Sequence, residues 1–270
     1  GMSFLNDERV VEGGLHPLLR LKGGKGDSLN NAVLEARTVV ATAFKGKRVC
    51  YKALDAPTDE FRRLHGGEDE PLERNPLLGW RGIRRELEDP GLLRAEYEAV
   101  RRAVEAGCDN IGIKVPFIRS IDDYKWARQV AVEVGLKPHE DVAFGASIET
   151  PAAALTVDGI LDAGVDFLSI GVNDLTMCCL GVDRESERVA GLFDPAHPAV
   201  IMLLDEIAAR ARGKVFLAAA GAIAQSPQLM KELIRMRFDP MGISLPSLAQ
   251  VRPPTATWRD GGCAHLFGDG

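Results

Sequence analysis

Short apolar runs alternate along the chain with longer segments in which apolar residues recur every three or four positions. The short runs are typical of buried strands, and the longer segments are typical of helices with one apolar face. Strands are expected at 48–53, 111–116, 142–148, 166–171, 214–219 and 241–245. Helices are expected at 91–106, 121–135, 152–163, 197–212 and 227–237. This repeated strand–helix order predicts an α/β fold with a parallel sheet.

Two stretches depart from the repeating pattern. The connection 54–90 is far longer than usual and contains NPLLGWRGIR, which indicates a functional lid or substrate loop. This connection contains a basic cluster at Arg81, Arg84 and Arg85, which acidic residues interrupt. Most of these arginines are expected to lie on a solvated helix face. The Pro- and Gly-rich segment from 252 is expected to be poorly ordered. One domain is therefore expected over 2–251, followed by a tail over 252–270.

Two predicted strands end in acidic residues. Glu149 follows the apolar run in GASIETPAAA, and Asp174 lies in VDFLSIGVNDLTMCCLGVDR, directly after Asn173. The C-terminal ends of barrel strands converge on one mouth, so the two carboxylates are expected to share a hard cation. Carboxylate oxygens suit Mg²⁺, which keeps several waters and binds substrate oxygens. The alternative is that both acids only cap helices, because these residue types are common at helix N-termini.

Composition excludes several classes of protein. The chain has 270 residues, of which 46% are hydrophobic and 27% charged, with a formal net charge of -6. A single α/β barrel takes about 250 residues, so the length permits that fold in one domain. The acidic balance argues against nucleic-acid binding. No apolar run approaches the ~20 residues of a membrane span, and the N-terminus lacks a signal-peptide core, so a cytoplasmic protein is expected.

The cysteines predict no metal or disulfide framework. They stand at Cys50, Cys108, Cys178, Cys179 and Cys263, an odd number with no C-x-x-C spacing. Cys50 and Cys108 are expected to be buried thiols. Cys178 and Cys179 follow what reads as an NDLT turn, with no evident activating group beside them.

Five segments carry a family resemblance: DAPTDEFRRLHGGEDEPLERNPLLGWRGIRR, IGIKVPFIRS, GASIETPAAA, VDFLSIGVNDLTMCCLGVDR and HPAVIMLL. Together they resemble the C-terminal barrel of the phosphoenolpyruvate-utilising enzymes, a family that includes phosphoenolpyruvate synthase, pyruvate phosphate dikinase and enzyme I of the sugar phosphotransferase system. The likeness runs in the same order over roughly residues 15 to 250. It implies a (β/α)8 TIM barrel that binds phosphoenolpyruvate or pyruvate through Mg²⁺.

The resemblance also implies roles for individual residues. Glu149 and Asp174 resemble the metal ligands of the family. Arg81 resembles the arginine of the LGWRG motif, which holds the transferred phosphoryl group, and Asn173 and Arg184 resemble substrate contacts. A guanidinium matches phosphate or carboxylate oxygens with two parallel hydrogen bonds, and a metal stabilises an enolate oxygen.

Two positions depart from the family pattern. Lys52 stands where the family has an arginine, so the charge needed for catalysis and substrate binding is kept and the bidentate fork is lost. Ala220 stands where the family has its proton-donating cysteine, and Ala222 replaces an acid or amide. An alanine exchanges no proton with an enolate carbon, so the family's interconversion of phosphoenolpyruvate and pyruvate is expected to be disabled unless another acid substitutes.

Compared with the family, the sequence is expected to lack some barrel strands and two domains. About six strands are found where a closed barrel has eight, so the barrel is expected to be incomplete at its N-terminal strands. Closure is expected from a rearranged N-terminal segment, a second subunit or a separately encoded partner. No nucleotide-binding domain is seen, and none of the histidines has the T-[CS]-H context of a phosphohistidine domain. A partner that carries those domains is therefore expected. Members of the family pair through this barrel, so the resemblance also implies a homodimer.

Three functions remain open. The first is a Mg²⁺-dependent phosphoenolpyruvate- or pyruvate-binding barrel of the phosphotransferase type, a transferase or kinase. The second is a Mg²⁺-dependent lyase or aldolase that acts on a keto acid through a metal-stabilised enolate and needs no cysteine at Ala220. The third is a ligand-binding or regulatory protein without catalysis, which fold alone does not exclude.

Overall fold

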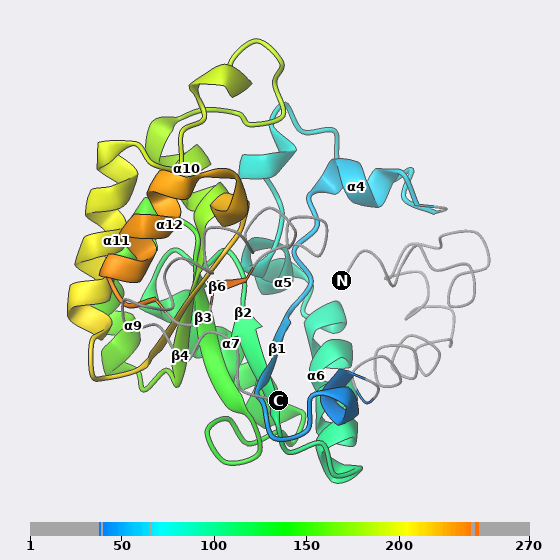
Figure 1. The fold of residues 1–270 in the computed structure, drawn as a ribbon. Coiled ribbons are helices and arrows are strands. Elements are labelled where there is room, and N and C mark those ends of the chain that lie inside the picture. The colour runs from blue at the N-terminus through cyan, green and yellow to red at the C-terminus, as the bar shows by residue number, and fades with distance from the viewer. Residues whose placement is uncertain (1–37, 39, 65, 239–240, 243–270) are drawn as a thin grey trace. The chain divides into compact units, whose positions relative to one another are not determined.

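The computed structural model describes residues 38, 40–64, 66–238 and 241–242 (Figure 1). The chain divides into two compact units, Gly1–Ala146 and Ser147–Gly270, and each is described by itself. The predicted tail over 252–270 lies outside the described residues, as does most of the segment before the first strand. The division into a domain over 2–251 and a tail stays a prediction.

The first unit is built on parallel strands with helices between them. Strand β1 (Val49–Lys52) pairs in parallel with β2 (Ile111–Val115), and β2 pairs in parallel with β3 (Ala143–Ile148), which runs across the boundary into the second unit. Between these strands lie α4 (Thr58–Arg62), the short 3₁₀ helix η2 (Pro76–Leu78), α5 (Ile83–Glu88), α6 (Gly91–Glu105) and α7 (Ile121–Glu133).

Three aromatic side chains pack together in the core of this unit. Helix α6 buries Tyr97, and α7 buries Tyr124. Both rings pack against Phe144 of β3, with centroids 6.0 and 5.8 Å away. Ser120 begins α7 by accepting a hydrogen bond from the backbone N–H of Asp123 at 3.4 Å. The apolar face of each helix thus fixes it against the sheet.

The second unit repeats the pattern. Its strands are β4 (Phe167–Gly171), β5 (Phe216–Ala220) and β6 (Met241–Gly242), which pair in parallel in that order. Its helices are α8 (Pro151–Leu155), α9 (Val157–Asp162), α10 (Val172–Leu180), η3 (Ala190–Leu192), α11 (Pro198–Ala211), η4 (Ala222–Gln225) and α12 (Pro227–Arg235). Helices α11 and α12 run side by side (Figure 1).

The strand order of the sheet is β1-β2-β3-β4-β5-β6, the same as the order along the chain. Sequential parallel strands joined by helices are the arrangement found in (β/α) barrels. The predicted parallel α/β fold is thereby confirmed over these six strands. Closure into eight strands stays a prediction, and residues 243–245 of the last predicted strand lie outside the described residues.

Several element predictions were wrong. The helix expected over 152–163 is two helices, because the hydroxyl of Thr156 bonds the carbonyl of Ala152 at 2.8 Å and the chain leaves the helical conformation there. The expected NDLT turn belongs to α10, so Cys178 and Cys179 lie in the last turn of that helix. The connection 54–90 contains α4, η2 and α5, and its role as a lid or substrate loop stays a prediction.

Two predictions of exposure were also wrong. Cys50 is exposed, because an apolar strand sequence does not decide which of its positions are covered. Cys108 is buried, as predicted. Arg81 and Arg85 are buried rather than solvated, because each guanidinium is paired with a buried carboxylate.

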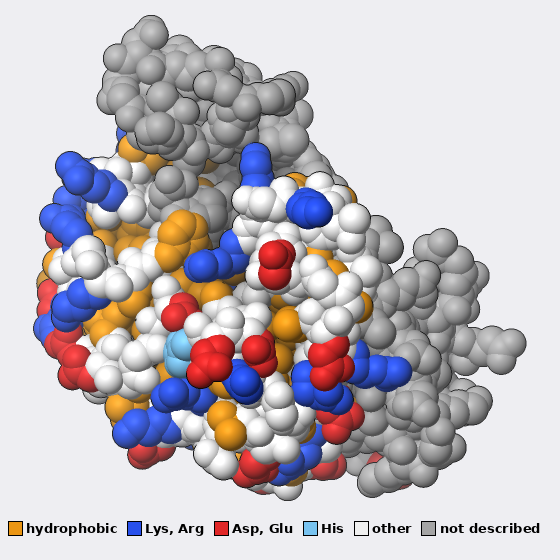
Figure 2. Space-filling view, turned by 90° about the horizontal axis from the view of Figure 1, so that it is seen from below, with side chains coloured by type: hydrophobic (Ala, Val, Ile, Leu, Met, Phe, Trp, Pro, Cys, Tyr) orange, Lys and Arg blue, Asp and Glu red, His pale blue; other side chains and the backbone are white. Residues whose placement is uncertain are grey.

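The charges on one face of the molecule are mixed. In Figure 2, basic and acidic side chains alternate across the surface and do not separate into fields of one sign. Within the described residues, no helix is both long and apolar enough to cross a membrane.

Candidate functional site

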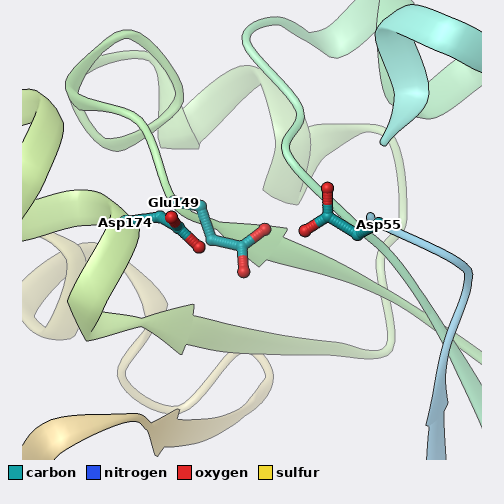
Figure 3. A group of neighbouring side chains, drawn as sticks. All are labelled: Asp55, Glu149 and Asp174. Carbon is teal, nitrogen blue, oxygen red and sulfur yellow. The ribbon is translucent and has the colours of Figure 1, made fainter. Parts of the chain in front are cut away.

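Two predicted metal ligands come together in the second unit. Glu149 directly follows β3, and Asp174 lies in the first turn of α10, directly after β4. Both are buried, and a carboxylate oxygen of one lies within 4.8 Å of a carboxylate oxygen of the other. Figure 3 shows the two side chains next to each other, and it also draws Asp55, which belongs to the first unit.

Glycines make room for these side chains. A Cβ atom at Gly171, the last residue of β4, would lie 2.5 Å from Cγ and Oε1 of Glu149. A Cβ atom at Gly221, directly after β5, would lie 2.8 Å from Oδ1 of Asn173. Gly221 also has a φ of 126°, a backbone conformation that residues other than glycine rarely adopt. Glycine is therefore favoured at these two positions because the side chains of Glu149 and Asn173 occupy the space that a side chain there would need.

Arg184 completes this group. Its Nη2 lies 3.6 Å from Oδ1 of Asp174. Helix α10 ends at Leu180, and Gly181 terminates it in the left-handed conformation with a φ of 62°, three residues before Arg184. Buried carboxylates side by side repel each other unless cations compensate them. Arg184 supplies one positive charge, and the oxygen donor set of Glu149 and Asp174 fits a hard divalent cation as a second.

In the first unit, Arg81 and Lys52 meet on one carboxylate. Arg81 donates from Nε to Oδ1 of Asp55 at 2.9 Å and from Nη2 to Oδ2 at 2.8 Å. Nζ of Lys52 lies 2.8 Å from Oδ2 of the same residue. Burial by itself raises the pKa of Asp55, but Lys52 and Arg81 together outweigh it and lower the pKa below its ordinary value. Asp55 therefore stays ionised and holds both cations.

The loop that carries Arg81 is shaped by Glu73. Its carboxylate accepts the backbone N–H of Trp80 at 3.0 and 3.1 Å and the hydroxyl of Thr58 at 2.8 Å. A Cβ atom at Gly79 would lie 2.1 Å from Oε1 of Glu73, so a side chain there would displace the carboxylate. Gly79 of the LGWRG motif thus leaves the space that the Glu73 carboxylate occupies.

The next turn is fixed by Arg85. It donates from Nη1 and Nη2 to the two carboxylate oxygens of Glu70 at 2.7 and 2.6 Å. Its guanidinium lies 4.3 Å from the ring centroid of Phe61 and 4.0 Å from that of Trp80. Trp80 therefore packs against an arginine inside the unit.

The structure gathers the predicted site residues into two groups, one in each unit. Lys52 and Arg81 meet on Asp55, whereas Glu149, Asp174 and Arg184 lie together. Asn173 lies against Gly221, and Ala220 ends β5. Sequence reasoning assigned no role to Asp55 or Glu73. The only signal for Asp55 was its spacing of three residues after Lys52.

The comparisons with known proteins decide the family. The sequence model described as the PEP-binding domain of PEP-utilising enzymes matches residues 27–258. The chain belongs to this family. It is 42% identical over 258 residues to the phosphoenolpyruvate synthase of Pyrococcus furiosus, which covers 95% of this chain and 32% of that protein. It is 36% identical over 254 residues to the probable phosphoenolpyruvate synthase of Methanocaldococcus jannaschii, covering 93% of this chain and 21% of that one.

The chain thus spans a third or less of these two relatives. Among solved structures it is similar to malate synthase of Haloferax volcanii, with a TM-score of 0.51 and 13% identity. That match covers 85% of this chain and 60% of the other. At this identity the likeness concerns the fold alone.

Proposed function

We propose that the chain is a Mg²⁺-dependent domain that binds phosphoenolpyruvate or pyruvate and works in phosphoryl transfer. The observation that carries the proposal is the buried pair of Glu149 and Asp174, held at the ends of neighbouring strands with Arg184 beside it. Membership of the PEP-utilising family supports the substrate class. A closed (β/α)8 barrel and a homodimer are part of the same proposal.

Each residue has a role in this proposal. Glu149 and Asp174 hold the cation, and Asn173 and Arg184 bind the carboxylate or enolate oxygens of the substrate. Arg81 binds the phosphoryl group, and Lys52 adds a point charge, which lacks the geometric selectivity of a guanidinium. The cation, when bound, supplies positive charge that stabilises an enolate oxygen.

The side chain at Ala220 limits the reaction. Ala220 ends β5, and its methyl group neither gives nor accepts a proton. Interconversion of phosphoenolpyruvate and pyruvate therefore requires an acid from elsewhere. We propose that a partner with nucleotide-binding and phosphohistidine domains supplies the phosphoryl group.

Calorimetric titration tests the proposal. Phosphoenolpyruvate, pyruvate and oxalate, an analogue of enolpyruvate, are titrated into the native protein with and without Mg²⁺. Binding is expected only with Mg²⁺, and Glu149→Ala is expected to lose it. Asp162→Ala, which removes an exposed carboxylate of the same unit, serves as the control and should bind as the native protein does. Binding that is indifferent to Mg²⁺, or that survives Glu149→Ala, would contradict the proposal.

A lyase or aldolase acting on a keto acid is a second candidate. Ala220 favours it in the direction of carbon–carbon bond formation, because C3 of an enolate then attacks a carbon electrophile and takes up no proton. Formation of a longer keto acid from pyruvate and an aldehyde would establish this activity. Metal-dependent binding without turnover of any substrate would instead indicate a regulatory protein of the same family.

A further inference from the structure

Phe117 has an unusual backbone conformation. It follows β2 in the segment VPFIRS, has a φ of 54°, and its side chain is fully buried. For a bulky residue the left-handed conformation costs roughly 1–2 kcal/mol relative to ordinary regions. Conformations of this kind persist where the surrounding structure demands them, often at functional sites.

The ring of Phe117 lies under two arginines of the LGWRG loop. The guanidinium carbon of Arg81 is 4.5 Å from the ring centroid, and that of Arg84 is 4.8 Å from it. The two chain segments also touch directly. A Cβ atom at Gly82 would lie 3.0 Å from Cβ of Phe117 and 2.7 Å from Oδ1 of Asp55, so only glycine allows this approach.

The two arginines are used differently. Arg84 donates from Nη1 to the backbone carbonyls of Leu78 and Gly79, the latter at 3.2 Å, so it ties the loop to itself. Arg81 is held along one edge by Asp55 and donates from Nη1 to the carbonyl of Leu77 at 3.3 Å. Asp55 binds the edge of the Arg81 guanidinium through two hydrogen bonds, whereas the Phe117 ring packs against the guanidinium carbon.

We propose that Phe117 is a positioning residue for Arg81, with its ring setting the plane in which that guanidinium meets the phosphoryl group of phosphoenolpyruvate. This inference rests on the proposed function. A guanidinium binds a phosphoryl group well only when its plane matches the oxygens, so tilting it weakens the contact. The left-handed backbone at Phe117 brings the ring under the arginine, which gives a reason for keeping a strained conformation.

The test compares two ligands in two matched variants. Phe117→Leu removes the aromatic face, and Phe144→Leu removes another fully buried ring of the same unit, one that packs with Tyr97 and Tyr124. Phosphoenolpyruvate has a phosphoryl group and oxalate has none. Each ligand is titrated with Mg²⁺ into the native protein and both variants, and urea unfolding measures the stability of each. Phe117→Met, which fills the volume with a flexible side chain, replaces the leucine variant if that one does not fold.

Phe117→Leu is expected to weaken phosphoenolpyruvate binding about fivefold to tenfold, the scale of one lost cation–π contact, and to leave oxalate binding unchanged. Phe144→Leu should change neither affinity, although it also lowers stability. Phe117→Tyr, which keeps an aromatic face, should restore phosphoenolpyruvate binding. The inference is overturned if Phe117→Leu keeps native affinity for phosphoenolpyruvate, or if it loses both ligands in equal measure. A native protein that binds neither ligand would instead refute the proposed function.

Discussion

The roles of single residues depend on space as much as on charge. Glu149 occupies the volume that a side chain at Gly171 would need, with its Cγ and Oε1 only 2.5 Å from the position of that Cβ atom. Real Cβ atoms do not approach other atoms so closely, so one of the two must move. We expect the Glu149 side chain to move, because a side chain shifts more easily than the backbone of a strand.

Gly171→Ala is therefore expected to weaken Mg²⁺-dependent oxalate binding at least tenfold, since a displaced Glu149 no longer shares a cation with Asp174. Titration calorimetry measures this directly. Gly191→Ala is the control, because a Cβ atom there meets nothing within 4 Å among the described residues. Native affinity in Gly171→Ala would show that Glu149 holds no metal.

At the residue scale, the sequence predicts the site residues that lie within a motif, but not the residues that contact them from distant parts of the chain. Lys52, Arg81, Asn173 and Asp174 stand in recognisable motifs. Asp55 was missed because its partnership with Arg81 spans 26 residues, and nothing local indicates a contact of that length. The contact of Arg81 with the Phe117 ring likewise joins two segments that only the fold brings together.

At the scale of elements, a buried acid joins two helices. Glu86 of α5 accepts the backbone N–H of Leu93, near the start of α6, at 3.0 Å. Burial raises the pKa of Glu86 to about 8, although this hydrogen bond and Arg85 act in the opposite direction. The folded protein therefore holds a proton on Glu86 that the unfolded chain releases at much lower pH.

This difference makes the free energy of unfolding depend on pH. The folded-state pKa is raised, so the stabilisation is greatest below the unfolded pKa of 4.5 and declines as the pH rises toward about 8. The slope in this window approaches ~1.4 kcal/mol per pH unit from this one group. Glu86→Gln keeps an acceptor for Leu93 and should flatten the decline. Glu88→Gln, an exposed residue of the same helix, should not. Urea unfolding from pH 5 to pH 9 measures both, and equal slopes in Glu86→Gln and the native protein would contradict the assignment.

Most strands and the longer helices were predictable, because their apolar spacing repeats over whole turns or pleats. Helix α10 was not, since Asn173, Asp174 and Thr176 are residues that commonly form turns. Their place in a helix follows from position, since α10 begins directly after β4 and an acid is favourable in a first helical turn. The break at Thr156 depends on one side-chain hydrogen bond, which periodicity does not reveal.

At the scale of the whole molecule, the sequence shows the family and the parallel α/β fold, and the family match over residues 27–258 agrees with both. The number of strands in a closed barrel is a different kind of property, because closure depends on pairing between distant strands. Within the described residues the structure has six strands in sequential order. The chain spans a third or less of the two relatives described above, so the activity of a longer protein would draw on parts beyond this domain.

The central claim is that Glu149 and Asp174 hold a divalent cation, and electron paramagnetic resonance with Mn²⁺ tests it most directly. Mn²⁺ takes the same oxygen ligands as Mg²⁺ and loses its free-ion signal on binding. The native protein is expected to bind one Mn²⁺ that Mg²⁺ displaces and oxalate tightens. Asp174→Asn should lose this binding, and Asp162→Asn, an exposed acid in the same unit, should keep it. Native Mn²⁺ binding in Asp174→Asn, or no saturable site in the native protein, would contradict the account.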